Sequence, residues 1–390
     1  MKHLFNLDPS IHFLNHGSFG ACPKPVFEAY QRWQAELERQ PVAFLGRKVT
    51  ALLAESRRAL ACFLNVEADD LVYFPNPTTA LNMVARSLIS ATQAPRLVAG
   101  DEILTTDHEY GALDRTWNYI CGQVGAKVVR RPIPLPLPSP SDFVAHFWEG
   151  VSSRTRVIFI SHITSPTGLI FPVEEVCSLA RQHGIVTIID GAHAPGQIPL
   201  DLDAVGADIY AGACHKWLCA PKGASFLHAR REVQRWLEPL VVSWGWEAEQ
   251  PGPSQFVDWH EWQGTRDVAA FLTVPDAIRF QEQHDWPWVR EQCHVLAAET
   301  RERLVSLTGL RPICSDAAFG QMFAAELPAC DLDWLKTRLY DEHRVEVPFT
   351  RWDGRCFVRV SFQAYNDRAD AYALLRGLAL LLPELTGGRA

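Results

Sequence analysis

A lysine and an aspartate stand at the ends of two neighbouring apolar segments of this 390-residue chain. Asp190 ends the run Val186-Thr-Ile-Ile-Asp190, and Lys216 ends the segment 208–216. A lysine amine can hold an aldehyde as a Schiff base, and a carboxylate can keep a pyridine nitrogen protonated so that the ring withdraws electrons. The pair therefore predicts pyridoxal phosphate chemistry. Taken singly, Asp190 would be interpreted as a cap and Lys216 as a solvated side chain; it is the pair that favours the cofactor.

The elements that must position this pair follow an alternating pattern of strands and helices. The segment 172–184 has a proline at its start, acids in its first turn and a glycine just past its end, which predicts a helix. The proline-rich run 132–140 predicts an extended surface connection. Strands are predicted at 102–105, 127–130, 157–160, 186–189, 208–211 and 225–227. The order predicts an α/β fold with a mostly parallel sheet covered on both faces.

Polar side chains follow four of these strands. His108 follows the first strand and Ser165 follows the third; Asp190 ends the fourth, and His215 and Lys216 follow the fifth. In open α/β sheets the ligand lies beyond the carboxyl ends of the strands. The sequence therefore predicts that these groups meet at one edge of the sheet.

A phosphate site is expected at the segment 76–83, where Pro77 precedes Thr78 and Thr79 at the opening of a helical pattern. Free backbone amides, the helix dipole and two hydroxyls would all favour an anion there. A simple helix cap is the alternative interpretation of the same residues.

Composition narrows the class of protein. The net charge is −8 and basic residues do not cluster, which argues against nucleic acid as a partner. No apolar run approaches the roughly 18 residues needed to cross a bilayer, and the start of the chain does not resemble a signal peptide. The ten cysteines are scattered without any CxxC spacing, so we expect reduced thiols, no metal site and a cytoplasmic protein.

Eight motifs together resemble a known family. They are FLNHGSFG at 13–20, NPTTA at 76–80, TDHEYG at 106–111, SHITSPTG at 161–168, DGAH at 190–193, HKWLCAPKG at 215–223, GTRD at 264–267 and RVS at 359–361. In this order they resemble fold-type I pyridoxal phosphate enzymes of the class V aminotransferase superfamily. Within it, they are most similar to the branch that holds isopenicillin N epimerase-like proteins and carbon–sulfur lyases.

The resemblance implies a two-domain architecture. A large pyridoxal phosphate-binding domain, with a mostly parallel sheet of seven-stranded type, is expected over residues 20–265. A small α+β domain is expected from residues 266–390 together with the N-terminal segment 1–19. The apolar periodicity of 369–381 predicts a terminal amphipathic helix of that small domain.

The resemblance also implies roles around the cofactor. A histidine at the position of His108 stacks on the cofactor ring in relatives, and the residue at His193 contacts the ring's phenolic oxygen. Many superfamily members have glutamine at that second position, so the tautomer of His193 is left open. Ser165 is also expected to bind the cofactor, and Asp190 to contact the ring nitrogen.

Further positions match ligands of the cofactor phosphate. These are Thr78, Thr79 and His215, although Ala213 replaces a polar residue found in many relatives. Thr265 resembles a threonine that reaches across a dimer interface to the phosphate of the neighbouring subunit. A homodimer with a shared active site is therefore expected.

Substrate binding is expected to centre on Arg359. It matches the arginine that holds the substrate α-carboxylate in relatives, and a guanidinium is a natural partner for a carboxylate. A salt-bridged strand arginine is the alternative. The positions Asn15, His16, Ser18 and Arg47 are expected to shape the rest of the pocket.

The expected reaction begins with removal of the α-proton of an amino acid by Lys216, whose pKa desolvation would lower. Three outcomes then stay open: epimerisation, β-elimination by a carbon–sulfur lyase acting on a cysteine conjugate or sulfoxide, or transamination. His108 is a candidate second acid for epimerisation. Cysteine desulfurases carry a cysteine before the C-terminal arginine, and the stretch 345–354 has none. A catalytically idle binding protein is the non-enzymatic alternative.

Overall fold

The computed structural model describes residues 1–90 and 95–386 of the chain. A seven-stranded sheet forms its centre, in the order β2-β8-β7-β6-β5-β3-β4. Its strands are β2 (Leu71–Phe74), β3 (Glu102–Thr106), β4 (Lys127–Arg131), β5 (Thr155–Ser161), β6 (Val186–Gly191), β7 (Ile209–Ala213) and β8 (Ser225–Ala229). All neighbours among β4, β3, β5, β6 and β7 pair in parallel, whereas β8 pairs antiparallel with β7 and β2. The predicted α/β class and all six predicted strands are confirmed; β2 was not predicted.

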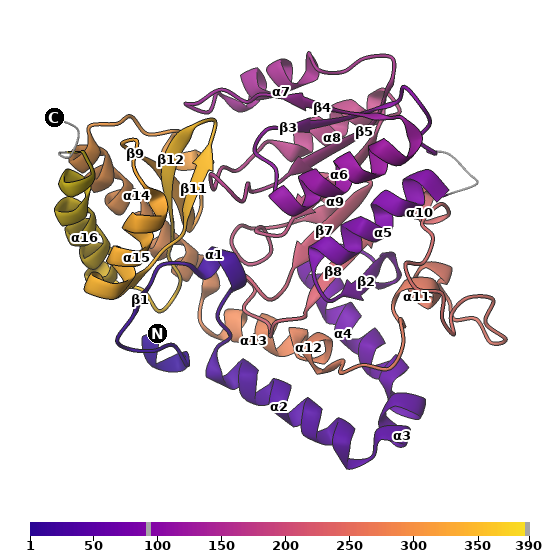
Figure 1. The fold of residues 1–390 in the computed structure, drawn as a ribbon. Helices are drawn as coiled ribbons and strands as arrows, with labels where there is room; N and C mark the ends of the chain where they lie inside the picture. Colours follow the sequence, from indigo (N-terminus) through magenta and orange to yellow (C-terminus); the bar gives the residue numbers. More distant parts are fainter. Residues whose placement is uncertain (91–94, 387–390) are drawn as a thin grey trace.

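Helices cover both faces of this sheet because its central strands are apolar on both sides. Val157 and Phe159 of β5 belong to a core with α5 and α6, whereas Ile158 and Ile160 belong to a core with α4, α7 and α8. The helices of this part are α2 (Lys24–Arg39), α3 (Pro41–Ala43), α4 (Val49–Leu64), α5 (Pro77–Ser90), α6 (Gly111–Val124), α7 (Pro140–Trp148), α8 (Val173–Gln182), α9 (Leu202–Val205), α10 (Arg231–Gln234) and α11 (Gln255–His260). In Figure 1, α5 and α6 lie in front of the strands. Buried parallel strands of this kind leave their carboxyl ends as the natural place for a ligand.

A second, three-stranded antiparallel sheet follows, in the order β11-β12-β9. Its strands are β9 (Met322–Leu327), β11 (Phe349–Trp352) and β12 (Arg355–Ser361). The remaining helices are α12 (Ala269–Leu272), α13 (Val274–Gln283), α14 (Trp286–Thr308), α15 (Leu332–His343) and α16 (Arg368–Thr386). Helix α16 includes the predicted segment 369–381 and extends beyond it at both ends.

The N-terminal segment joins this smaller part. Strand β1 (His12–Phe13) pairs in parallel with β10 (Val345–Glu346), and Asn15 bridges to Ser361. Figure 1 shows this indigo segment beside the yellow C-terminal elements, with the short helix α1 (His16–Phe19) between the two sheets. Helices α12 and α13 pack instead on α2 and α4. The domain bounds at residues 20 and 265 stay a prediction.

Within the described ranges no helix is both long and apolar enough to cross a membrane.

Candidate active site

A cavity of about 520 Å³ lies at the carboxyl ends of the central strands, where the two sheets face each other. The start of α5, the ends of β5, β6 and β7, helix α1 and strand β12 all contribute to its wall. The predicted site residues that line it are Ser18, Thr78, Ser165, Asp190, His193, His215, Lys216 and Arg359. The fold therefore brings together eight predicted residues from six separate segments.

Two glycines allow the backbone to approach closely at this site. A Cβ on Gly191, the residue after Asp190, would lie 2.0 Å from the ring of Tyr210. A Cβ on Gly20 would lie 2.0 Å from the carbonyl oxygen of His215, and the φ of Gly20 is +69°. Side chains at these positions would push apart the segments that carry Asp190 and Lys216, so both glycines are required by the packing.

The amine of Lys216 is buried and lies 3.1 Å from Nε2 of His193. The indole nitrogen of Trp217 donates to Nδ1 of the same imidazole at 3.2 Å. An indole N–H can only donate, so Nδ1 accepts and Nε2 carries the proton of the neutral ring. Burial, with the charge of Lys216 adding to it, holds the pKa of His193 well below its usual range. His193 is therefore a neutral donor, which resolves the tautomer that the sequence left open.

This tautomer requires Lys216 to accept a hydrogen bond, which only a neutral amine can do. Burial lowers the pKa of Lys216 to about 8, and the nearby charge of Arg359 contributes in the same direction. The charge of Asp190 opposes these effects but is outweighed. Lys216 therefore has the properties of a nucleophile and of a base that can work near neutral pH.

Asp190 is a buried carboxylate that accepts one hydrogen bond, at 3.0 Å, from the backbone N–H of Ala192. Burial raises its pKa, although this hydrogen bond and the charge of Lys216 work in the opposite direction. No ion pair of Asp190 exists among residues 1–90 and 95–386. A cationic ring nitrogen would supply the missing partner, so this carboxylate fits a pyridinium.

The two threonines in the first turn of α5 have different surroundings. Thr79 donates through both its backbone N–H and its hydroxyl to Oδ1 of Asn76, at 2.8 and 3.0 Å. Thr78 lines the cavity, and its hydroxyl has no hydrogen-bond partner in the part of the chain that is described. The cap is thus present at Thr79, whereas the phosphate role of Thr78 stays a prediction that its place in the cavity wall and its unpartnered hydroxyl support.

His215 also lines the cavity. Its Nδ1 lies 3.0 Å from the carbonyl oxygen of Ala224, which can only accept, so Nδ1 carries the proton of the neutral ring. Burial lowers the pKa of His215 to about 4. A phosphate contact through Nε2 would therefore need a second proton, which a neighbouring dianion would favour.

Arg359 is a buried guanidinium that has no carboxylate partner among the described residues. Its Nη1 donates to the carbonyl oxygen of Ser165 at 2.5 Å, and its Nη2 donates to the hydroxyl of Ser18 at 3.0 Å. Its Nε is buried and has no acceptor, and burial lowers its pKa to about 10. An unpaired, buried guanidinium beside Lys216 fits the carboxylate of a substrate better than a structural salt bridge.

Asn15 and His16 support the wall from behind. Asn15 accepts from Ser18 at 2.5 Å and donates to Glu346 at 2.9 Å, so it orients the hydroxyl that contacts Arg359. His16 is fully buried, and its Nε2 lies 3.0 Å from the carbonyl oxygen of Lys216. Neither side chain lines the cavity.

The placement of His108 differs from the expectation. Its ring is fully buried outside the cavity, with Nδ1 2.9 Å from the Thr167 hydroxyl and Nε2 3.3 Å from the Ile133 carbonyl oxygen. It packs against Trp352, with the ring centroids 4.2 Å apart and the ring planes tilted by 31°. Because both ring nitrogens and one ring face are occupied by protein, His108 is not available to stack on a ligand in this cavity or to protonate one.

Two neighbours of His108, which sequence reasoning missed, reach the site instead. Tyr110 lines the cavity and is 45% exposed. Glu109 accepts hydrogen bonds of 2.6 Å from both Thr106 and Ser161, and Ser161 lines the cavity. Burial, followed by the smaller effect of the Asp190 charge, raises the pKa of Glu109 to about 8. Both residues belong to the same TDHEYG motif at 106–111 as His108, and this was the one sign in the sequence that they lie near the site.

Thr265 and Arg47 lie on the exposed surface and do not line the cavity of their own chain. Arg47 belongs to the π-helical turn η2 (Phe44–Lys48). The expectation that Arg47 shapes the pocket is therefore not met within one chain, because its segment lies on the surface away from the cavity; the contact of Thr265 with a neighbouring subunit stays a prediction.

Comparison with known proteins identifies a matching family over most of the chain. The family model described as aminotransferase class V matches residues 22–374. The chain is 38% identical to an isopenicillin N epimerase of Amycolatopsis lactamdurans over 387 residues, which is 96% of each protein. It is 28% identical to a probable chloroplastic L-cysteine desulfhydrase of Arabidopsis thaliana, with 94% of this chain and 82% of the relative covered.

Solved structures show the same fold. The apo structure of a cysteine desulfurase from Thermococcus onnurineus NA1 superposes with a TM-score of 0.83, covering 98% of each chain at 20% identity. The predicted fold type is thereby confirmed.

Proposed function

This chain belongs to the aminotransferase class V family and is a pyridoxal phosphate-dependent enzyme, and from that premise we propose that it epimerises an α-amino acid by moving its α-proton. The observation that carries the proposal is the geometry of one cavity. An amine with a lowered pKa, a buried carboxylate and an unpaired guanidinium line it together, at Lys216, Asp190 and Arg359. The 38% identity to an isopenicillin N epimerase supports epimerisation as the outcome.

The bound cofactor supplies an aldehyde that bonds to an amine and a ring that withdraws electrons from Cα. The residues that would hold it are Asp190 at the ring nitrogen, His193 at the phenolic oxygen, and Thr78 and His215 at the phosphate. The buried, unpaired Asp190 carboxylate and the unpartnered Thr78 hydroxyl fit these roles.

The chain's own residues then act on the substrate. Arg359 holds the α-carboxylate through N–H groups that have no protein acceptor, and Ser18 and Ser165 fix the orientation of the guanidinium. With the carboxylate held there, Lys216 Nζ removes the α-proton as a neutral base. Return of a proton to the opposite face requires a second donor, and Tyr110 is the cavity residue whose phenol offers one.

We also propose that the enzyme acts as a homodimer in the cytoplasm. The exposed positions of Thr265 and Arg47 support a second copy, because their expected contacts are absent within one chain. All ten cysteines are free thiols, which suits a reducing compartment.

Incubation of the holoenzyme with candidate L-amino acids in ²H₂O tests the reaction. We expect the α-proton to be exchanged and the configuration inverted without release of pyruvate or ammonia. Loss of this exchange in Lys216→Ala, with retention in Lys222→Ala, would link it to the buried amine. Retention of the exchange in Lys216→Ala contradicts the proposal.

A carbon–sulfur β-lyase is the second candidate function, because the chain is similar over 94% of its length to a probable L-cysteine desulfhydrase. Formation of pyruvate and ammonia from a cysteine conjugate would favour it. A desulfurase is not proposed: the stretch 345–354 has no cysteine, and Cys356 is buried within β12.

A further inference from the structure

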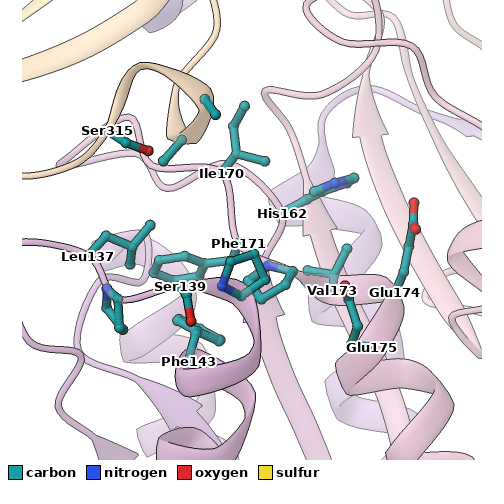
Figure 2. Close-up of a pocket in the computed structure, with 15 residues that line it drawn as sticks. Leu137, Ser139, Phe143, His162, Ile170, Phe171, Val173, Glu174, Glu175 and Ser315 are labelled. Atoms are coloured by element: carbon teal, nitrogen blue, oxygen red, sulfur yellow. The ribbon is translucent and has the colours of Figure 1, made fainter.

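A second cavity, of about 530 Å³, lies between the large-sheet part of the chain and the segment that leads into β9. It is enclosed by the proline-rich segment before α7, the start of α8 and the turn η4 (Asp316–Ala318), which precedes β9. Figure 2 shows Ser315 on one side, Leu137 and Phe143 on another, and Glu174 and Glu175 on a third. Its volume is in the range of small-molecule sites.

The wall is apolar with an acidic rim. Phe143 and Phe171 are buried side chains that form the apolar part together with several prolines. Glu174 and Glu175 are exposed in the first turn of α8 and form no ion pair or hydrogen bond within residues 1–90 and 95–386. No lysine or arginine lines the cavity. A ligand that complements this wall is a cation with an apolar body.

One polar side chain, His162, lines the cavity from inside and is only 6% exposed. Its Nδ1 lies 2.9 Å from the hydroxyl of Tyr210, which has no other hydrogen-bond partner in the described chain. The phenol must therefore donate to Nδ1 if its buried proton is to be satisfied, which leaves the proton of the imidazole on Nε2. Nε2 has no protein acceptor and is free to donate to a ligand.

The same histidine is connected to the cofactor site. Its backbone N–H donates to the carbonyl oxygen of Asp190 at 2.9 Å. Tyr210 packs its ring directly on Gly191, where it occupies the space of a side chain. A ligand that pulls on His162 therefore acts on both the backbone of Asp190 and the residue next to it.

We propose that this second cavity, the cation cavity, binds a small organic cation with an apolar body that accepts a hydrogen bond from His162, and that its occupancy is transmitted to Asp190 through His162 and Tyr210. The binding step does not depend on the proposed epimerase function. The effect of binding on Asp190 can be detected through the bound cofactor alone, so its test does not require epimerase activity.

Calorimetric titration of the holoenzyme with para-acetylbenzyltrimethylammonium tests the binding. This probe carries a carbonyl acceptor, and its quaternary nitrogen cannot bond to the cofactor aldehyde. We expect saturable binding, at least about tenfold weaker binding of the anion phenylacetate, and about fivefold weaker binding of the probe to Glu174→Gln/Glu175→Gln. The matched control, Glu291→Gln/Glu302→Gln, changes two exposed carboxylates on α14 and is expected to bind as the wild type does.

A variant that fills the cavity from its exposed edge, Ala317→Trp, is expected to abolish binding while the cofactor stays bound. Absence of saturable binding to the wild type would overturn the proposal. Binding of equal strength to the wild type, Ala317→Trp and the double glutamine variant would also overturn it, since the probe would then lie elsewhere.

The transmission is tested by the absorption band of the bound cofactor. We expect a saturating concentration of the probe to move the pH midpoint of this band by about 0.3 unit or more. Tyr210→Phe keeps the cavity and is expected to retain binding but lose the movement. A band that the probe leaves unchanged in the wild type, or moves equally in Tyr210→Phe, refutes the transmission.

Discussion

The cofactor cavity and the cation cavity enclose nearly equal volumes, about 520 and 530 Å³, yet they place their charges differently. The cofactor cavity buries an amine, a guanidinium and a carboxylate, and none of these groups has an ion-pair partner within the described residues. The cation cavity buries only a neutral imidazole and keeps its carboxylates on an exposed rim.

This difference in where the charges lie shows how one fold can provide a reactive site and a site suited only to binding. Burying an unpaired charge costs free energy and shifts its pKa, so it persists where a ligand will later compensate it. Apolar walls with charges at the rim avoid that cost and give affinity without reactivity. Variants that remove the unpaired charges should therefore lose activity and gain stability.

The largest expected effect comes from Lys216→Met, which keeps the volume of the side chain and removes the amine. We expect epimerase activity to fall by about 10⁴-fold, because both the bond to the cofactor and the base are lost. The apoprotein should become more stable by about 1–2 kcal/mol, since a buried amine with a pKa of about 8 is no longer desolvated. Steady-state rates and urea unfolding measure the two effects.

The exposed Lys222 provides the control, and Lys222→Met should leave both quantities nearly unchanged. If the Lys216→Met apoprotein is inactive but less stable than the wild type, burial of the amine does not lower the free energy of unfolding, and the prediction is wrong.

Arg359→Gln should have the next largest effect. The loss of the unpaired guanidinium is expected to lower kcat/KM by about 100-fold, mostly through KM, because the substrate carboxylate loses its partner. The matched control is Arg355→Gln in the same strand: Arg355 is paired with Glu326 and only partly buried, so activity should stay within about twofold. Equal losses in the two variants would show that strand stability, not carboxylate binding, is affected.

The two adjacent threonines of α5 give a smaller and sharper contrast. Thr78→Val should weaken pyridoxal phosphate binding by about tenfold, because one hydroxyl donor to the phosphate is lost. Thr79→Val should leave the affinity close to that of the wild type and lower the stability by about 1 kcal/mol, because it removes a hydrogen bond to Asn76. Cofactor titration and thermal unfolding of both apoproteins measure these effects, and a reversed pattern would exchange the two roles.

Thr78 and Thr79 also show how much of the site could be predicted from the sequence. Strand ends and a lysine, an aspartate and an arginine of suitable spacing predicted the sheet and the members of the cofactor cavity, because periodicity fixes which segments are strands and parallel strands share one edge. The orientation of adjacent residues was beyond that reasoning. Successive residues of a helix point about 100° apart, and the hydrogen bonds of the cap hold Thr79 on Asn76 while Thr78 lines the cavity.

The motif around His108 fails for a related reason. Residues 107–110 follow β3 as an irregular turn without a period, so nothing in their order tells which side chain faces the cavity. Packing decides it: Trp352, more than 240 residues later, covers the ring of His108 and leaves Glu109 and Tyr110 toward the site. The cation cavity was equally hidden, because its walls come from the proline-rich run 132–140 and from residues 315–318, which only the tertiary structure brings together.

The smallest expected effect concerns Glu109. Because this carboxyl group is largely buried beside the cofactor cavity, it should make the stability of the protein depend on pH. Its pKa in the folded apoprotein is raised to about 8 from an unfolded value near 4.5. The stability that Glu109 contributes is therefore complete below about pH 4.5 and is lost as the pH rises toward 8.

Glu109→Gln removes this titration, so the difference in unfolding free energy between the wild type and the variant should shrink between pH 5 and pH 8. We expect a change of at least about 1 kcal/mol, a lower bound on the linkage value because the side chain keeps some contact with solvent. Urea unfolding of the apoproteins at several pH values measures it, and Glu175→Gln supplies the matched exposed carboxylate of the cation cavity. If the two variants give the same dependence on pH, the carboxylate beside the cofactor cavity is no more perturbed than the one at the rim of the cation cavity. The proposed electrostatic difference between the two cavities would then be wrong.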